Sequence, residues 1–173
     1  MNAHSQPVAT DESHAFKAMS GHADRWRGEC IQQFAELEVI VEDLLRDLQR
    51  ESKNGSKVKV GLMVGPAFGH LRELTGSKGP FASKGQAISE TLAELASWVE
   101  WRAHLTHGVL SVWRGRDEQW LLTLAHRAIG DPTMRTHALT WKAACAVKEL
   151  MAKQIVKLRE NARSLSNAVS QKT

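Results

Sequence analysis

The feature that most restricts the fold is an apolar stripe that runs through residues 15–52. Apolar side chains recur there at alternating spacings of mainly three and four residues. This spacing keeps them on one side of an α-helix with 3.6 residues per turn. We therefore predict one long amphipathic helix, whose stripe consists of Trp26, Cys30, Phe34, Leu37, Val41, Leu44 and Leu48.

Two further segments repeat this helical period. The first covers residues 83–108, and the second follows Gly130-Asp-Pro132 and continues to a polar tail. Between glycine- and proline-containing breaks, the run Ala67–Leu74 predicts a short helix. The stripe residues of the two longer segments are Ile88, Leu92, Leu95 and Val99, and then Ala144, Val147, Met151, Ile155, Leu158, Ala162 and Leu165.

A β hairpin is predicted between these helices. Val109–Trp113 and Trp120–Leu124 are β-prone runs on either side of a polar stretch that contains Arg114 and Arg116. The two arginines are expected near the tip. The predicted fold is therefore mainly α, a helical bundle with three substantial helices, one short helix and a small β hairpin.

Length and composition favour one domain. The 173 residues are 42% hydrophobic, which is enough for a single core. Residues 1–14 have no apolar period, so we predict a flexible N-terminal leader over 1–14 and a single domain over 15–170. No apolar stretch approaches the length of a membrane span, and no secretory signal pattern is present, so we expect a cytoplasmic protein that does not insert into a membrane.

Charge is unevenly distributed along the chain. Residues 29–51 carry seven acids against Arg46 and Arg50, whereas residues 141–173 carry seven bases against Glu149 and Glu160. Helices of opposite sign attract when they pack together. Two solvated faces of opposite sign are the expected arrangement, and a basic groove for RNA or DNA is the alternative. The overall formal charge of +4 permits an anionic partner without requiring one.

Cysteine usage points to free thiols. Cys30 and Cys145 are far apart, and each lies inside an apolar helical pattern. Neither a zinc-type spacing nor a disulfide framework is visible, so buried thiols in a reducing compartment fit this pattern.

The main candidate site is the run from Trp101 to Gly108, where a core-like helical face ends in ionisable groups. Arg102 and His107 are five residues apart, which separates them by about 140° around an ideal helix and about 7.5 Å along it. Gly108 is predicted to end the helix in a left-handed backbone conformation. A guanidinium and an imidazole are the groups needed to hold a phosphate and move a proton.

This Arg-Ala-His-Leu-Thr-His run resembles the signature of the HEPN superfamily, an Arg followed four to six residues later by a His near the end of a core helix. The resemblance implies a HEPN-like helical bundle and a metal-independent endoribonuclease, with Arg102 and His107 of two chains lining one dimer cleft. Arg102 would hold the scissile phosphate, and His107 would be the general acid or base. The family often has a polar residue where this chain has Ala103, and His104 and Thr106 are the candidates for that supporting role.

The resemblance also implies partners. It predicts a homodimer, RNA as substrate, a toxin or defence setting, and an antitoxin protein as a further partner. Arg114 and Arg116 are candidates for further phosphate contacts, and Trp101 for stacking on bases. Core packing or a dimer seam is the alternative role for Trp98 and Trp101.

Other interpretations of the same residues remain open. Arg102 could pair with Glu100 or with a carboxylate of the acidic first helix, while His107 caps a helix end. The protein would then be a noncatalytic helical interaction protein or a nucleic-acid-binding protein. His104 and His107 have no third ligand at a convincing spacing, so we predict no metal and no cofactor.

Overall fold

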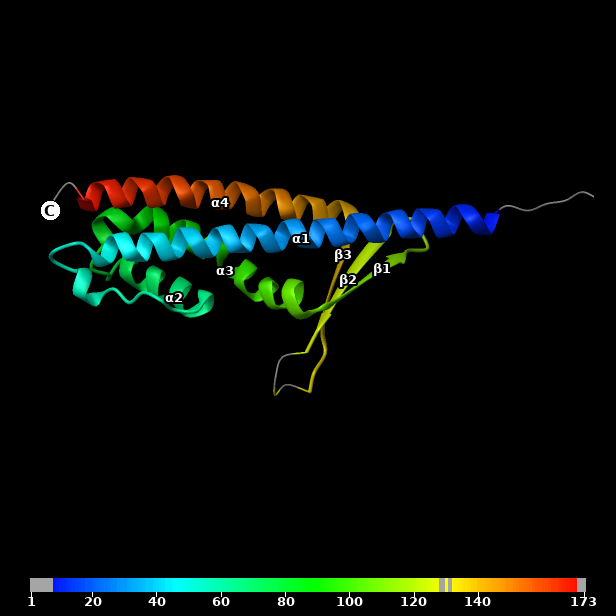
Figure 1. The fold of residues 1–173 in the computed structure, drawn as a ribbon, viewed down its shortest axis with the longest axis horizontal. Coiled ribbons are helices and arrows are strands. Elements are labelled where there is room, and N and C mark those ends of the chain that lie inside the picture. Colours follow the sequence, from blue (N-terminus) through cyan, green and yellow to red (C-terminus); the bar gives the residue numbers. More distant parts are fainter. Residues whose placement is uncertain (1–7, 128–129, 131, 171–173) are drawn as a thin grey trace, which may run out of the picture. The chain divides into compact units, whose positions relative to one another are not determined.

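The computed structural model describes residues 8–127, 130 and 132–170. Figure 1 shows a mainly helical chain with a small antiparallel sheet, which confirms the predicted fold class. Within the described residues, three long helices, one shorter helix, a 3-10 turn and three strands follow in the order α1 (Val8–Gln49), η1 (Gly55–Lys57), α2 (Val64–Thr75), α3 (Ala82–His107), β1 (Val109–Arg114), β2 (Trp120–His126), β3 (Arg135–Thr140) and α4 (Trp141–Ser170).

Two element boundaries differ from the sequence prediction. Helix α1 begins at Val8 and so includes residues 8–14 of the predicted leader, whose residues 1–7 lie outside the described residues. The last helix begins only at Trp141, because the residues before it form β3, which pairs with β2. The Thr140 hydroxyl accepts a hydrogen bond from the Ala143 N–H (3.1 Å) and caps the new helix start.

The chain divides into two compact units that are discontinuous in sequence. Unit 1 consists of residues 1–31 and 103–148, and unit 2 consists of residues 32–102 and 149–173. The long helices α1, α3 and α4 each contribute one part to each unit, and the single domain over 15–170 stays a prediction.

Unit 2 is built from helices whose apolar stripes face a common core. Leu37, Leu92 and Leu158 are fully buried, and they come from α1, α3 and α4. The Trp98 indole N–H donates to the Gln154 side-chain oxygen (2.6 Å), which satisfies the one polar atom of that buried ring. Helix α2 adds Phe68 and Leu71 to the same unit.

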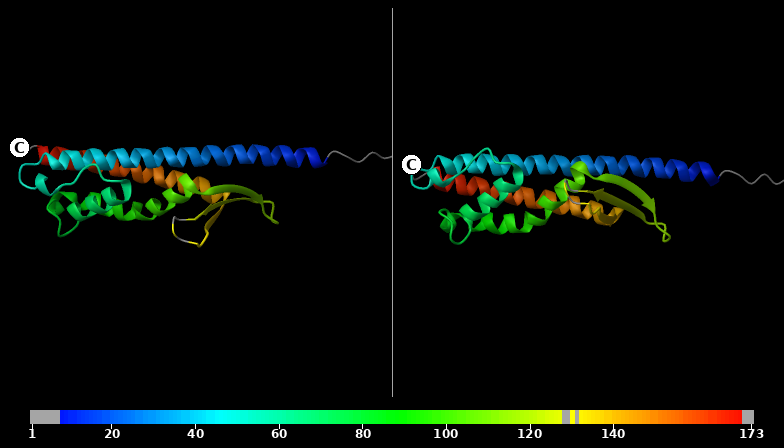
Figure 2. Two further views of the ribbon diagram at one scale, coloured as in Figure 1. Left: turned by 60° about the horizontal axis from the view of Figure 1, so that its bottom comes forward. Right: turned by 90° about the horizontal axis from the view of Figure 1, so that it is seen from below.

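Unit 1 packs helical segments together with the three-stranded sheet. The sheet order is β1-β2-β3, with both pairs antiparallel, and Figure 2 shows the strands side by side. Val112, Leu122 and Leu124 are the buried strand residues, so the even-numbered positions of β1 and β2 form the inner face. The Trp26 indole N–H donates to the Ala144 carbonyl (2.8 Å), which joins α1 to α4 inside this unit.

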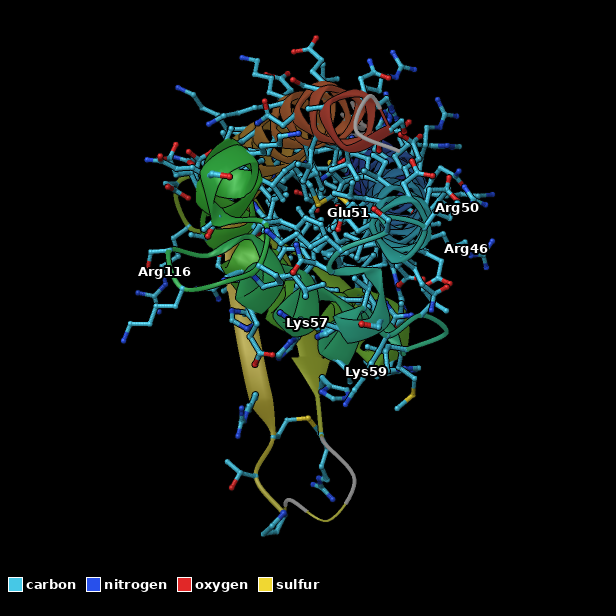
Figure 3. All side chains as sticks on the ribbon, turned by 90° about the vertical axis from the view of Figure 1, so that its left-hand side faces the viewer. Arg46, Arg50, Glu51, Lys57, Lys59 and Arg116 are labelled. Carbon is cyan, nitrogen blue, oxygen red and sulfur yellow. The ribbon has the colours of Figure 1, made fainter. Side chains whose placement is uncertain are left out.

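Acidic residues of α1 and basic residues of α4 form ion pairs inside each unit. In unit 2, Arg159 of α4 pairs with Glu36 of α1 (2.9 Å), and in unit 1 Lys148 pairs with Glu29. Arg46 of α1 and Arg50, which directly follows this helix, point outward (Figure 3), where they pair with carboxylates about one helical turn away. In the part of the chain that the structure describes, no helix has the length and apolar character needed to span a bilayer.

Candidate phosphate site

The C-terminal end of α3 is held by an arginine from α1. The Arg27 guanidinium donates to the carbonyls of Leu105 (2.6 Å) and Thr106 (3.3 Å), two of the acceptors that a helix end leaves without an internal partner. A cation at this position also interacts favourably with the helix dipole. Arg27 therefore fixes the segment that carries His104 and His107.

Gly108 ends this helix for a reason other than the predicted one. The prediction of a left-handed backbone conformation at Gly108 is wrong, because the described glycines with positive φ are Gly61 and Gly130. A Cβ atom at Gly108 would instead lie 2.3 Å from the His104 carbonyl oxygen and 3.2 Å from the Ala125 carbonyl oxygen. The missing side chain thus lets β1 start directly against the end of α3.

Arg102 belongs to unit 2 and has an acidic partner there. Its Nε donates to Glu38 Oε1 at 2.7 Å, and both side chains are 36% exposed. This is the predicted alternative in which Arg102 pairs with a carboxylate of the acidic first helix. Arg102 and Glu38 both line a cavity of about 830 Å³ beside the start of α2, whereas His107 belongs to unit 1 and has other neighbours.

The structure brings four histidines of unit 1 together. The buried His104 ring packs edge-on against His137, with ring centroids 4.3 Å apart, and against His126 at 5.3 Å. The exposed His107 ring lies 6.2 Å from His126. His126 is therefore in contact with both α3 histidines.

Strand register explains why the two strand histidines face α3. His126 continues the alternation of Leu122 and Leu124 along β2, so it lies on the inner face of the sheet. His137 is paired with Leu124 and consequently shares that face. Inner-face positions hold apolar residues along most of β2 and polar rings only near its end.

One pocket of unit 1 collects three groups that suit a phosphate. His107, His126 and Arg127 line a cavity of about 580 Å³, together with Ala103, Val109, Ala125 and Met134. Arg127 is exposed and directly follows β2. A guanidinium can bind a phosphate through a planar fork, and imidazoles can give or take a proton near neutral pH. The pocket thus contains a guanidinium and imidazoles, the two kinds of group that the sequence prediction assigned to Arg102 and His107.

The predicted substrate-binding residues have different surroundings. Arg114 pairs with Glu118 and lies 5.8 Å from the centre of the Trp120 ring, so its charge already has neighbours. Arg116 is exposed in the hairpin turn and its side chain points outward (Figure 3). Trp101 contacts Trp98 edge-on in unit 2, with centroids 6.3 Å apart, which fits the packing alternative.

Cysteine chemistry is separate from this pocket. Burial raises the pKa of the Cys30 thiol to about 12, so Cys30 stays protonated at neutral pH and is a poor nucleophile. Cys145 is also free and is partly exposed.

The hydrogen bond from Lys148 lowers the pKa of Glu29, and the same contact raises the pKa of Lys148.

Among the described residues, no group of three or more His, Cys, Asp or Glu side chains is arranged to hold a metal ion, and this includes the histidine cluster.

Sequence reasoning missed His126, His137 and Arg127. A signal for His126 was present, because Leu-Thr-Leu-Ala-His continues an inward-facing alternation along a predicted strand. His137 had no such signal, since β3 itself was not predicted. Arg127 directly follows β2, which ends at His126. The sequence prediction ended this strand two residues earlier, at Leu124, and so gave Arg127 no defined position.

Comparisons with family models, with curated proteins and with solved structures find no match to this chain.

Proposed function

We propose that this chain is a metal-independent endoribonuclease of the HEPN-like kind, with its catalytic groups in the pocket of His107, His126 and Arg127. The single observation that carries the proposal is the presence of two imidazoles and a guanidinium in one pocket of one unit. Separate acid and base groups and a fixed cation are what phosphodiester cleavage without a metal requires. The assignment keeps His107 from the sequence motif and gives the phosphate-binding role of Arg102 to Arg127.

The proposed reaction is an internal transesterification. One imidazole removes the proton of the RNA 2′-hydroxyl, whose oxygen attacks the adjacent phosphorus, and the other imidazole protonates the leaving 5′-oxygen. The products are a 2′,3′-cyclic phosphate and a 5′-hydroxyl. Arg127 stabilises the charge that develops on the non-bridging phosphate oxygens. His104 and Arg27 act as positioning residues, since one packs against the His126 ring and the other holds the end of α3.

The wider setting follows from the resemblance. The homodimer, the toxin or defence role and the antitoxin partner remain predictions of the motif, and the cytoplasmic location remains a prediction from the sequence pattern. The pocket lies within one unit of one chain, so the proposed chemistry has its three groups without a second copy. Light scattering on the purified protein checks the dimer separately.

The test is cleavage of mixed single-stranded RNA in the presence of EDTA, followed by detection of the 2′,3′-cyclic phosphate. We expect the wild type to cleave, and we expect His107→Ala to lower the rate by about 10²- to 10⁴-fold because a proton-transfer group is lost. Arg127→Ala should lower it by about 10²- to 10³-fold.

Two surface variants are matched controls for these substitutions. His14→Ala and Arg25→Ala remove the same residue types from exposed positions of α1. Both should cleave at the wild-type rate. No cleavage by the wild type at any protein concentration, or full cleavage by His107→Ala, contradicts the proposal.

A noncatalytic nucleic-acid-binding or helical interaction protein is the second candidate. The ion pair between Arg102 and Glu38 favours it, because the motif arginine has a structural partner. In that case RNA binds without being cut, and the same EDTA assay separates the two functions.

A further inference from the structure

The outer face of the sheet in unit 1 carries no charged side chain among its described residues. Odd-numbered positions of β1 and β2 form this face, and β3 adds the positions paired with them. In a chain with 24% charged residues such a face is unusual. Its residues are Val109, Ser111, Trp113, Leu121, Thr123, Ala125, Thr136, Ala138 and Thr140.

Trp113 is the one aromatic residue of this face, and its ring is held in place. The indole N–H donates to the Thr123 hydroxyl oxygen at 3.0 Å, while the side chain remains 56% exposed. Thr123 lies on the neighbouring strand, where it pairs with Ser111. An indole that is fixed yet exposed is suited to stack on a flat ligand at a low cost in conformational entropy.

The same face leads into the proposed catalytic pocket. Val109 and Ala125 are a cross-strand pair on the outer face, and both line the pocket of His107, His126 and Arg127. Trp113 lies four residues further along β1, or about 14 Å at the rise of a strand. A few extended nucleotides cover that distance.

Arginines lie at the two ends of this path. Arg127 lines the pocket at one end, and the exposed Arg116 points outward from the hairpin turn at the other. The sheet positions of this face are uncharged, while Asp24 of α1 lines a cavity together with Ser111 and Trp113. A face that leads to the Arg127 guanidinium suits a strand that crosses it with its bases toward the sheet. It does not suit a duplex, whose paired bases have no free face to stack on Trp113.

A second copy of the chain fits this face less well. The three strands, each six or seven residues long, cover roughly 300 Å², whereas a stable interface buries about 800 Å² on each partner. The area therefore favours a small extended ligand over a sheet-to-sheet dimer.

We propose that single-stranded RNA lies along β1 on this outer face, with one base stacked on Trp113 and the scissile phosphate in the pocket of His107, His126 and Arg127. The inference rests on the proposed function, because it gives the substrate class and a base-binding residue for the same site. Trp113 is a binding residue in this proposal and takes no part in proton transfer.

The test uses a fluorescein-labelled eight-nucleotide RNA that is 2′-O-methylated and therefore resists transesterification. Fluorescence anisotropy measures its affinity for the full chain, as a single strand and as a duplex with its complement. We expect the single strand to bind more tightly. Trp113→Ala should weaken single-strand binding by about 5- to 100-fold, and Trp113→Phe should retain most of the affinity because it keeps an aromatic face.

Met63→Ala is the control, since it removes an exposed large apolar side chain from unit 2 and should leave the affinity unchanged. Thermal unfolding of each variant checks that the fold is retained. Equal binding of duplex and single strand, or wild-type affinity in Trp113→Ala, overturns the inference. A change from dimer to monomer in Trp113→Ala without any change in RNA binding also overturns it and identifies the face as a contact between copies.

The cleavage assay and the binding assay test the proposed nuclease function and the proposed base stacking on Trp113 separately. If the wild type cleaves RNA and His107→Ala does not, while Trp113→Ala binds as the wild type does, the stacking proposal fails and the nuclease stands. If no cleavage occurs but single-strand binding depends on Trp113, the nuclease fails and the base-stacking face stands.

Discussion

The two units use segments of the same three long helices for different purposes. Unit 2 joins them with α2 around leucine-rich stripes, and its charges form pairs such as Glu36 with Arg159 at the surface. Unit 1 combines them with a small sheet and surrounds the buried His104 with histidine rings. The pocket of His107, His126 and Arg127 belongs to unit 1, so the proposed chemistry lies in that unit.

The largest expected effect distinguishes the units by their histidines. His126→Ala in unit 1 should lower the rate of RNA cleavage by about 10²- to 10⁴-fold, because the pocket loses a proton-transfer group. His70→Ala in unit 2 should leave the rate unchanged, since His70 accepts a hydrogen bond from the Lys59 backbone N–H. Initial rates with a quenched fluorescent RNA measure both variants, and equal losses would remove the contrast between the units.

Shortening one buried leucine in each unit also tests the difference between the two units. Leu92→Ala in unit 2 and Leu124→Ala in unit 1 each remove a fully buried side chain, and each should lower the free energy of unfolding by about 2–5 kcal/mol. Leu124→Ala should also lower the cleavage rate, because Leu124 is the cross-strand partner of His137. Urea unfolding and cleavage assays at a temperature where both variants are folded test this difference. A larger loss of rate in Leu92→Ala would contradict it.

Gly108 and Gly28 form a matched pair within unit 1. Gly108→Ala brings a Cβ atom into the His104 carbonyl and should destabilise the fold by about 1–3 kcal/mol. Gly28→Ala lies in α1, where no other atoms are close, and should stabilise the fold by about 0.5–1 kcal/mol. Thermal unfolding measures both shifts, and a neutral Gly108→Ala would show that the end of α3 relaxes easily.

A smaller effect is expected at the original motif arginine. Arg102→Ala breaks a half-exposed ion pair and should lower the free energy of unfolding by about 0.2–1 kcal/mol. If the catalytic site is the pocket of His107, His126 and Arg127, this variant should still cleave RNA. If the motif arginine is catalytic, cleavage should be lost. A loss of rate as large as that of Arg127→Ala would return Arg102 to the catalytic site.

The smallest effect concerns the exposed pair of Glu29 and Lys148 in unit 1. The pKa of Glu29 is lowered in the folded state, so its stabilising effect is present above the unfolded pKa of 4.5 and is lost as the pH falls through the folded value. The pKa of Lys148 is raised, so its effect is present below 10.5 and is lost as the pH rises through the folded value. The difference in melting temperature between the wild type and Glu29→Gln should therefore be present at pH 7 and vanish at low pH. A difference that persists at low pH would contradict this linkage.

Sequence reasoning succeeded where structure depends on local periodicity. The stripes of α1, α3 and α4 and the β1–β2 hairpin follow from residue spacing alone. The candidate site depends on the pairing of β2 with β3, which brings His137 and His126 to one face although they are eleven residues apart. Such nonlocal pairing leaves little trace in a single sequence. His107 could be proposed from its motif, but its neighbours could not.

The most direct test of the central claim is NMR of the histidine rings during titration with the uncleavable single-stranded RNA. We predict that the His107 and His126 ring resonances shift first, and that Arg127→Ala weakens the titration whereas Arg102→Ala does not. Shifts confined to His14, His22 and His70, or a titration that depends on Arg102 and not on Arg127, would contradict the assignment of the phosphate site to unit 1.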